Sequence, residues 1–176
     1  MNRRRLSAEE IRDSILSATG VLNDTQGGPG FYLFKLEHPQ HSPHYEYHKY
    51  DPTNPMSYRR AVYRFVVRSQ PDPFMTILDC ADSSQSTPVR DETITSVQAL
   101  AFLNNKFNLA MAQKFSESLQ QSSTDITSQV RTAFSRMIGR LPTTQEQSEL
   151  EQYAREHDLE NLCRILFNLN EFIYLD

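Results

Sequence analysis

Tryptophan is absent from this sequence of 176 residues, and cysteine occurs only twice, as Cys80 and Cys163. Because neither cysteine belongs to a Cys-x-x-Cys pair, the segment offers no support for a thioredoxin-type centre, a thiolate zinc site or covalent haem attachment. Two cysteines are compatible with one disulfide or with two free thiols, so their number leaves the cellular compartment open.

Long apolar runs and an excess of positive charge are also missing. No window approaches the roughly 20 apolar residues that cross a membrane, and the arginines at positions 3–5 lead into a helical pattern instead of a signal-peptide core. Acidic residues outnumber basic ones by 22 to 18, a formal charge of −4, whereas nucleic-acid binding depends on a basic surface. We therefore expect no membrane span, no export signal in the chain as given and no nucleic-acid partner.

Large apolar side chains, in contrast, are plentiful. Hydrophobic residues make up 38% of the chain and include 10 Phe and 8 Tyr, a content too high for a disordered segment. The length is ordinary for one domain with one core. The sequence therefore predicts a single domain over residues 1–176.

The spacing of the apolar residues is mainly helical. Ser7 with Glu10 has the pattern of a capping box at a helix start, and Thr95 and Thr143 begin the same pattern again. Apolar residues then recur at steps of three and four, which predicts a mainly α fold, a bundle of about six or seven helices. The expected helices cover about 7–19, 95–103, 107–119, 126–138 and 143–157, with a last helix starting at Asp158.

The region from Asn23 to Thr93 has a different pattern and is expected to be a long irregular insertion with one or two short strands. Residues 27–30 predict a turn, residues 31–36 a short strand, and residues 76–78 a buried extended piece. Residues 58–68 fit a helix or a strand, and helical spacing favours the helix. Long irregular stretches are uncommon in compact domains and often carry function, so we look for sites here.

Four histidines in this region are the most metal-like feature. His38, His41, His44 and His48 lie within eleven residues, and imidazoles on one loop can bind zinc, copper or nickel. The prolines between these histidines keep their backbone positions apart, so a solvated loop is the favoured interpretation. We therefore predict no cofactor within this segment, with a metal as the less favoured alternative.

Tyrosines share the same loop. Tyr45 and Tyr47, with Tyr32 and Tyr50 nearby, are suited to contact a partner protein or to stack on sugar rings. Covering the core beneath the loop is the alternative, and large aromatic rings do this often.

A polar loop from Asp79 to Thr93 carries the acid–base candidates. Asp79, Asp82, Arg90 and Glu92 could perform acid–base chemistry if they converge, or they could hold the loop in place by ion pairs. The distances between these side chains in the folded protein decide between the catalytic and the structural role, and we favour the structural role.

Arginines form a further group, which comprises Arg59, Arg60, Arg64 and Arg68. With the tyrosines among them, they could bind phosphates or acidic glycans. Because the chain is acidic overall, we favour pairing with carboxylates of the polar loop and packing of the arginine stems on the core.

Several strings resemble one known family. They are residues 3–13, 27–29, 86–105, 139–143 and 166–172, and their order is kept along nearly the whole chain. The chain resembles the planctomycete-type domain of unknown function at the C-terminal end of large proteins that carry cytochrome c-like modules. The resemblance implies a C-terminal segment of a longer exported protein of the periplasm or cell envelope, with the upstream domains as partners, and it implies no established activity. Many members carry a cysteine where this chain has Ser86, so we expect no thiol mechanism.

Two functions follow as hypotheses. The favoured one is a non-catalytic docking, scaffold or ligand-contact domain of a larger protein, with the His/Tyr loop or the polar loop as its contact surface for protein or glycan. The alternative is part of a glycan-active or metal-dependent enzyme that uses the polar loop from Asp79 to Glu92.

Overall fold

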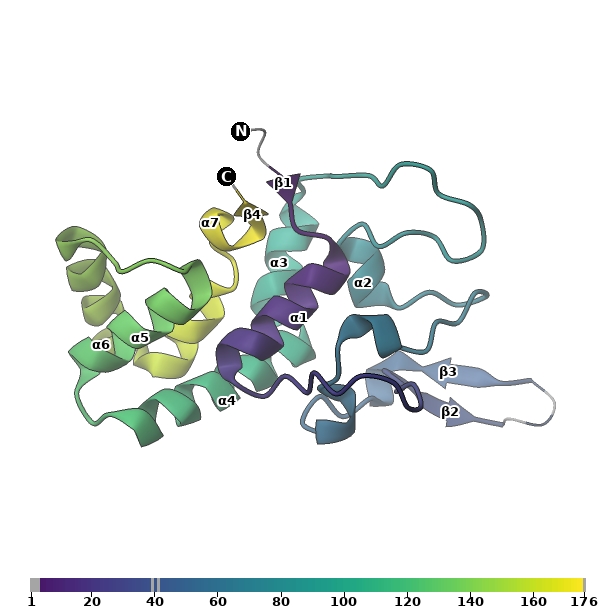
Figure 1. Ribbon diagram of the computed structural model, residues 1–176, viewed down its shortest axis with the longest axis horizontal. Helices are drawn as coiled ribbons and strands as arrows, with labels where there is room; N and C mark the ends of the chain where they lie inside the picture. The colour runs from purple at the N-terminus through teal and green to yellow at the C-terminus, as the bar shows by residue number, and fades with distance from the viewer. Residues whose placement is uncertain (1–3, 39, 41, 176) are drawn as a thin grey trace.

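The computed structural model describes residues 4–38, 40 and 42–175, and it is mainly α-helical (Figure 1). The α-helices are α1 (Ala8–Thr19), α2 (Pro73–Ile77), α3 (Ser96–Asn104), α4 (Lys106–Ser122), α5 (Ile126–Ile138), α6 (Thr144–Leu166) and α7 (Asn170–Ile173). The described strands pair antiparallel, β1 (Arg4–Arg5) with β4 (Tyr174–Leu175) and β2 (Lys35–Glu37) with β3 (His44–Glu46). The mainly α prediction with a few short strands is confirmed.

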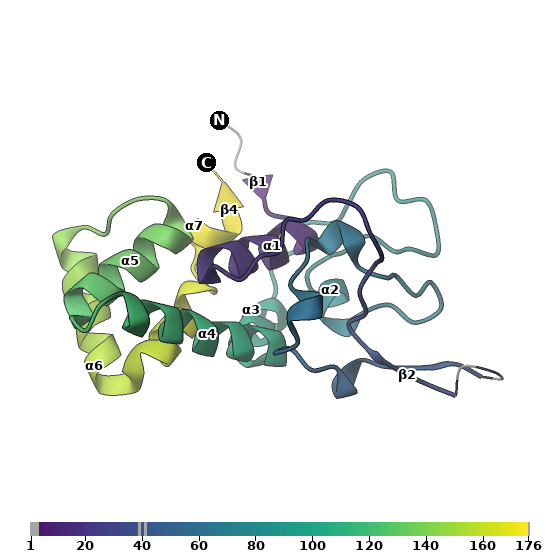
Figure 2. The ribbon, with the colours of Figure 1, turned by 60° about the horizontal axis from the view of Figure 1, so that its bottom comes forward.

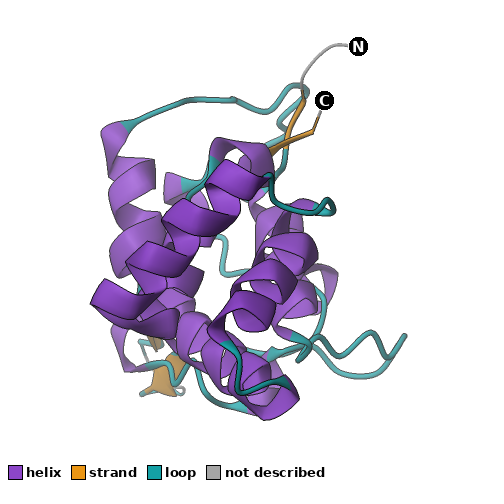
Figure 3. Ribbon diagram, turned by 90° about the vertical axis from the view of Figure 1, so that its left-hand side faces the viewer, coloured by secondary structure: helices purple, strands orange, loops and turns teal. Residues whose placement is uncertain are grey.

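The long helices gather at one end of the molecule. α4 packs against α1, α5 and α6, and α5 also packs against α6. Figure 3 looks onto this end and shows the helices side by side with the loops around them. The hairpin formed by β2 and β3 extends to the opposite end, and α2 lies between it and the bundle (Figure 1, Figure 2). The irregular first half is therefore attached to one side of a helical bundle, where the candidate sites lie.

Local signals explain the helix boundaries. Ser7 caps α1 in a capping box with Glu10, and Gly20 ends it in the left-handed conformation with φ of +81°. Thr95 and Thr143 cap α3 and α6 in the same way. The helix start predicted at Asp158 is seen as a break inside α6, where Asp158 has a φ of +69°. The Asp158 carboxylate accepts a hydrogen bond from the backbone N–H of Asn161, as a helix cap does.

The two ends of the described chain lie side by side. β1 and β4 pair in register, Arg4 opposite Leu175 and Arg5 opposite Tyr174. The next residue, Leu6, donates its backbone N–H to the carbonyl of Ile173 at 2.8 Å. This pairing fixes the start of α1 against α7. No helix in the described residues has both the length and the apolar character needed to cross a membrane.

Two predictions in the first half were wrong. Residues 58–68 form no α-helix but a 3₁₀ turn at Ala61–Tyr63 flanked by extended chain, because their backbone pairs with Phe31. The N–H of Phe31 donates to the carbonyl of Tyr63 at 3.1 Å, and the N–H of Phe65 donates to the carbonyl of Phe31 at 2.8 Å.

The segment 76–78 is also not extended, because Thr76 and Ile77 complete helix α2. Asp72 caps this helix and Pro73 is its first residue, a pairing that is a helix-start signal. The strand expected within residues 31–36 lies slightly later, at Lys35–Glu37.

Arg12 joins the helical bundle to the irregular half. This side chain belongs to α1, is only 1% exposed, and donates hydrogen bonds to the backbone carbonyls of Ser57 and Arg59. Its guanidinium lies 4.9 Å from the ring centre of Phe31 and 5.3 Å from that of Phe107. Since a buried charge needs hydrogen-bond partners, Arg12 and the carbonyls it satisfies hold the segment against α1.

We therefore expect Arg12→Ala to lower the free energy of unfolding by about 3 kcal/mol, because two buried carbonyls lose a charged donor and a cavity is left. Urea denaturation followed by circular dichroism measures this loss. Arg131→Ala is the control, since Arg131 is exposed on α5, and a change within about 0.5 kcal/mol is expected there. Equal effects of the two substitutions would contradict the anchoring role of Arg12.

Candidate functional site

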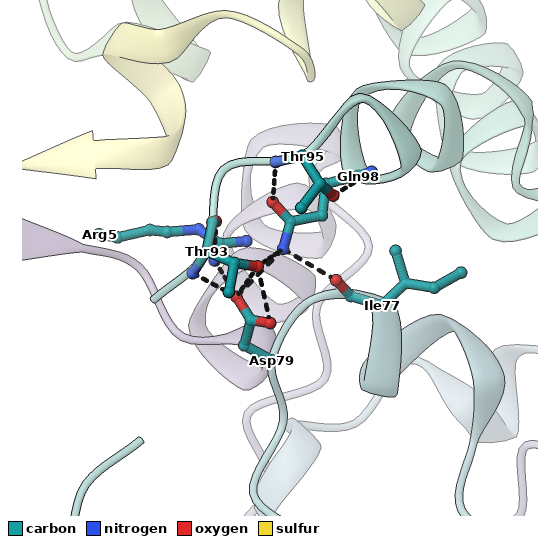
Figure 4. Close-up of polar contacts among 6 residues, drawn as sticks. All are labelled: Arg5, Ile77, Asp79, Thr93, Thr95 and Gln98. Atoms are coloured by element: carbon teal, nitrogen blue, oxygen red, sulfur yellow. Dashed lines mark hydrogen bonds and ion pairs between the residues drawn. The ribbon is translucent and has the colours of Figure 1, made fainter. Parts of the chain in front are cut away.

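Asp79 is held inside a polar cluster that joins three parts of the chain (Figure 4). Its carboxylate accepts hydrogen bonds from Arg5 at 2.5 Å, from the backbone N–H of Thr93 at 2.8 Å and from Nε2 of Gln98 at 3.0 Å. The hydroxyl of Thr93 lies within hydrogen-bond distance of both carboxylate oxygens, 3.0 Å from Oδ1 and 2.9 Å from Oδ2. Gln98 also donates to the carbonyl of Ile77 and completes the cap of α3. Both Asp79 oxygens are therefore engaged, which is the arrangement of a structural lock.

The electrostatics of Asp79 agree with this role. Burial raises the pKa of this carboxyl, but the hydrogen bonds from Thr93 and from Arg5 together lower it by more than burial raises it. The resulting pKa lies below the ordinary value of 3.8. Asp79 also has a φ of +60°, a left-handed conformation that aspartate and asparagine tolerate better than most residues. The carboxylate thus stays charged and bonded at neutral pH.

The other charges of the polar loop bind elsewhere. Arg90 pairs with Glu9 of α1 at 2.7 Å, and the thiol of Cys80 donates to the same carboxylate at 3.4 Å. Burial and the neighbouring Glu9 raise the pKa of Cys80 to about 11, so the thiol is protonated and unreactive. Asp82 accepts from the backbone N–H of Ser84 within its own turn.

The four residues predicted from the polar loop are therefore not brought together. Asp79 binds Arg5, Arg90 binds Glu9, and Asp82 stabilises its local turn, while Glu92 is exposed. General acid–base chemistry needs groups that converge on one reacting atom. The geometry of these side chains in the described residues is that of ion pairs that tie the loop to β1 and α1.

The arginine group is also used differently from the interpretation based on sequence. Arg59 donates to the backbone carbonyls of Thr25, Gly27 and Pro29, and its guanidinium lies 4.0 Å from the ring centre of Tyr63. It therefore closes the glycine-rich turn. The predicted pairing with polar-loop carboxylates is wrong for Arg59, because its guanidinium binds backbone carbonyl oxygens instead.

We expect Asp79→Asn to lower the free energy of unfolding by about 2 kcal/mol at neutral pH, because a charge-assisted bond to Arg5 is lost. Since the folded-state pKa is depressed, this contribution is present above about pH 3.8 and disappears as the pH falls through the folded value. Denaturation curves of the two proteins should therefore converge in acid.

Asp82→Asn is the matched control in the same loop, and it should change stability far less. A constant difference between wild type and Asp79→Asn down to the lowest pH would show that the carboxylate charge is not the cause.

The described histidines are not placed together as one metal-binding cluster. The rings of His38 and His44 have centres 5.9 Å apart, whereas Nδ1 of His48 lies 3.1 Å from Oε2 of Glu46. His41 lies outside the described residues. Within residues 4–38, 40 and 42–175, no group of three or more His, Cys, Asp and Glu side chains is placed to hold a metal ion.

We expect an equimolar amount of Zn²⁺ to leave the melting temperature unchanged, because the side chains of the described residues offer no site with three ligands. Differential scanning fluorimetry with and without chelator checks this. A rise in melting temperature that is lost in His44→Ala would revive the metal hypothesis.

The aromatic residues of the hairpin region form a half-exposed patch. We call Tyr32 and Phe65 the aromatic surface, since these residues are 55% and 47% exposed. The rings of Tyr32 and Phe65 have centres 5.1 Å apart. Beneath them Phe34 is buried and meets the rings of Tyr45 at 5.1 Å and Tyr32 at 5.3 Å. Tyr45 is therefore a supporting residue, and Tyr32 is the exposed one.

Tyr47 faces inward instead, toward a cavity of about 340 Å³. Its hydroxyl donates to the carbonyl of Gln70 at 2.7 Å, and burial raises its pKa to about 12. The cavity lies where the 3₁₀ turn η1 (Tyr47–Lys49) meets the starts of α2 and α4. Its walls are mostly apolar and include Leu33, Pro73, Phe74, Met75 and Phe107.

Asp72 on the wall of this cavity was missed by reasoning from the sequence. It is 7% exposed, one of its oxygens accepts from the N–H groups of Phe74 and Met75, and burial raises its pKa. The Asp–Pro pair after Pro71 is a signal that could have located it as a cap. Its neighbour across the cavity, Arg12, was also detectable as a charge within an apolar stripe.

Fold and site together define a mainly α domain with an attached irregular half that presents an aromatic surface and a small cavity. Comparison with known families identifies the chain further. A family described as PSD1, a protein of unknown function (DUF1553), matches residues 1–154, and the chain belongs to this family. None of the curated proteins matches the chain. None of the solved structures matches it either.

Proposed function

We propose that this chain is a docking domain of a longer protein and that the aromatic surface is its contact face. Support comes from the exposure of Tyr32 and Phe65, two large rings that lie together and are each about half open to solvent. Aromatic rings that lose their remaining exposure in a contact supply much of the energy of protein interfaces.

The occupant we propose is a protein surface. The two exposed rings are tilted by 44° to each other, so they offer a ridged apolar face. A sugar ring stacks best on a flat ring with hydrogen-bond donors around it, whereas the apolar core of a protein interface fits such a ridge. The resemblance to C-terminal domains of large cytochrome c-associated envelope proteins makes an upstream domain of the same polypeptide the proposed partner.

The enzyme alternative has less support. It needs free acid and base groups in the polar loop, and Asp79 and Arg90 are engaged with Arg5 and Glu9. Side chains already committed to ion pairs across the fold are poor proton donors and acceptors. We therefore attribute no reaction to this segment.

In-cell photocrosslinking tests the docking role in the full-length protein. A benzophenone amino acid replaces Phe65, and the same probe at the exposed Gln152 on α6 is the control. We expect position 65 to crosslink, well above position 152, to peptides of the same polypeptide outside these 176 residues. The additional substitution Tyr32→Ser should reduce the yield.

A measurement of the free energy of unfolding distinguishes a docking role of Tyr32 from a role in covering the core. In the isolated chain Tyr32→Ser should change the free energy of unfolding by less than about 1 kcal/mol, because its ring is already half solvated. A larger loss, crosslinks only within the chain, or labelling of glycan instead of protein would each contradict the proposal.

A further inference from the structure

Helix α3 and the residues just before it expose an apolar face. Ile94, Val97 and Leu100 are 82%, 59% and 60% exposed. Val97 and Leu100 are three residues apart and therefore lie on one side of the helix, and Ile94 stands just before its first turn. Another side of the helix, which includes Gln98 and Phe102, is buried in the protein. We call Ile94, Val97 and Leu100 the α3 face.

The α3 face belongs to a part of the chain without charge. Residues 93–105 contain no Asp, Glu, Lys or Arg, and this is the longest such run in a chain with 23% charged residues. A surface helix ordinarily carries charged residues on its solvent side, whereas the centre of a protein interface is depleted of charge. The α3 face therefore has the composition of a contact surface.

The two ends of the α3 face carry opposite charges. Asp91 and Glu92 are exposed and precede the N-terminal end of the helix. Arg164 of α6 lies at the C-terminal end, where it donates to the carbonyl of Leu103 and, at 3.0 Å, to the side-chain oxygen of Asn104. Among the described residues no carboxylate forms an ion pair with Arg164, so only neutral oxygen atoms accept its hydrogen bonds.

We propose that the α3 face binds the same face of a second copy of this chain, with the two α3 helices antiparallel across a two-fold axis. A symmetric contact brings the same patch of both copies together, and a patch without charge avoids the like-charge repulsion that this would otherwise create. The antiparallel arrangement places Asp91 and Glu92 of one copy near Arg164 of the partner subunit, and the two opposed helix dipoles also attract.

The size of the α3 face sets the expected strength of the dimer. Each partner of a stable dimer buries roughly 800 Å². Helix α3 has only nine residues, so it provides a small contact by this measure. We therefore expect a dimer that exchanges with the monomer, with a dissociation constant on the order of 10 µM.

Sedimentation equilibrium of the purified chain tests the dimer. Leu100→Glu should raise the dimer dissociation constant at least about tenfold, because a carboxylate from each copy would be buried near the two-fold axis. Val62→Glu is the matched control and should leave the constant unchanged. Val62 is 72% exposed, but it belongs to the 3₁₀ turn Ala61–Tyr63, which packs on α1. Ile94→Glu repeats the test at the most exposed position of the face, where a change in folding is not expected.

A charge reversal tests the antiparallel arrangement. Glu92→Lys should raise the dissociation constant about threefold at low salt, because a lysine would then oppose Arg164 of the partner subunit. The effect should fall as the salt concentration rises, since exposed charges are screened. Glu149→Lys makes the same change of charge at an exposed position of α6 and should have no effect.

Photocrosslinking in the full-length protein distinguishes a second copy from an upstream domain. Two copies with different tags are expressed together, and a benzophenone amino acid replaces Leu100 in one of them. We expect the probe at position 100 to capture the copy with the other tag, and the same probe at position 62 to capture far less.

Several outcomes would overturn the inference. They are a chain that stays monomeric up to about 100 µM, equal effects of Leu100→Glu and Val62→Glu, or crosslinks from position 100 only to upstream parts of the same polypeptide. An unchanged dissociation constant in Glu92→Lys would overturn the antiparallel arrangement. The docking role is tested at Tyr32 and Phe65, on a different surface, so either proposal can fail while the other stands.

Discussion

A single buried guanidinium connects the two halves of this molecule. Arg12 projects from the apolar stripe of α1 and satisfies the backbone carbonyls of Ser57 and Arg59 in a segment with little regular structure. Arg12 is 1% exposed, so both its charge and the carbonyls are shielded from solvent and need partners inside the protein. Each supplies the partner of the other, and removal of either one would leave the other buried without that hydrogen bond.

The same principle explains the remaining contacts between the halves. Asp79 binds Arg5, Thr93 and Gln98, and Lys106 binds three carbonyls of the hairpin region. In these contacts the charged groups hold loops to helices. Asp72 caps α2 beside a cavity instead, with Arg12 and Arg64 as its counter-charges. The proposed contact face lies where aromatic rings remain exposed.

Much of the helical half was predictable because its signals are local. The capping boxes at Ser7, Thr95 and Thr143, the stop at Gly20 and the break at Asp158 all act within one turn of helix. A domain family of unknown function was also recognisable from short strings in order, and the match over residues 1–154 agrees with this coarser part of the prediction, while the planctomycete type stays a prediction. The link to cytochrome c-like modules and to the cell envelope stays a prediction.

The sequence by itself determined the long helices and the caps at Ser7, Thr95 and Thr143, since these depend on neighbours three or four residues apart. It also determined the acidic composition of the chain. Only the tertiary structure decided which charged groups are paired. It turned residues 58–68 from an expected helix into chain paired with Phe31, and it separated Asp79, Asp82 and Arg90. It also placed Asp72 beside a cavity. Such outcomes depend on partners tens of residues away, which local patterns do not encode.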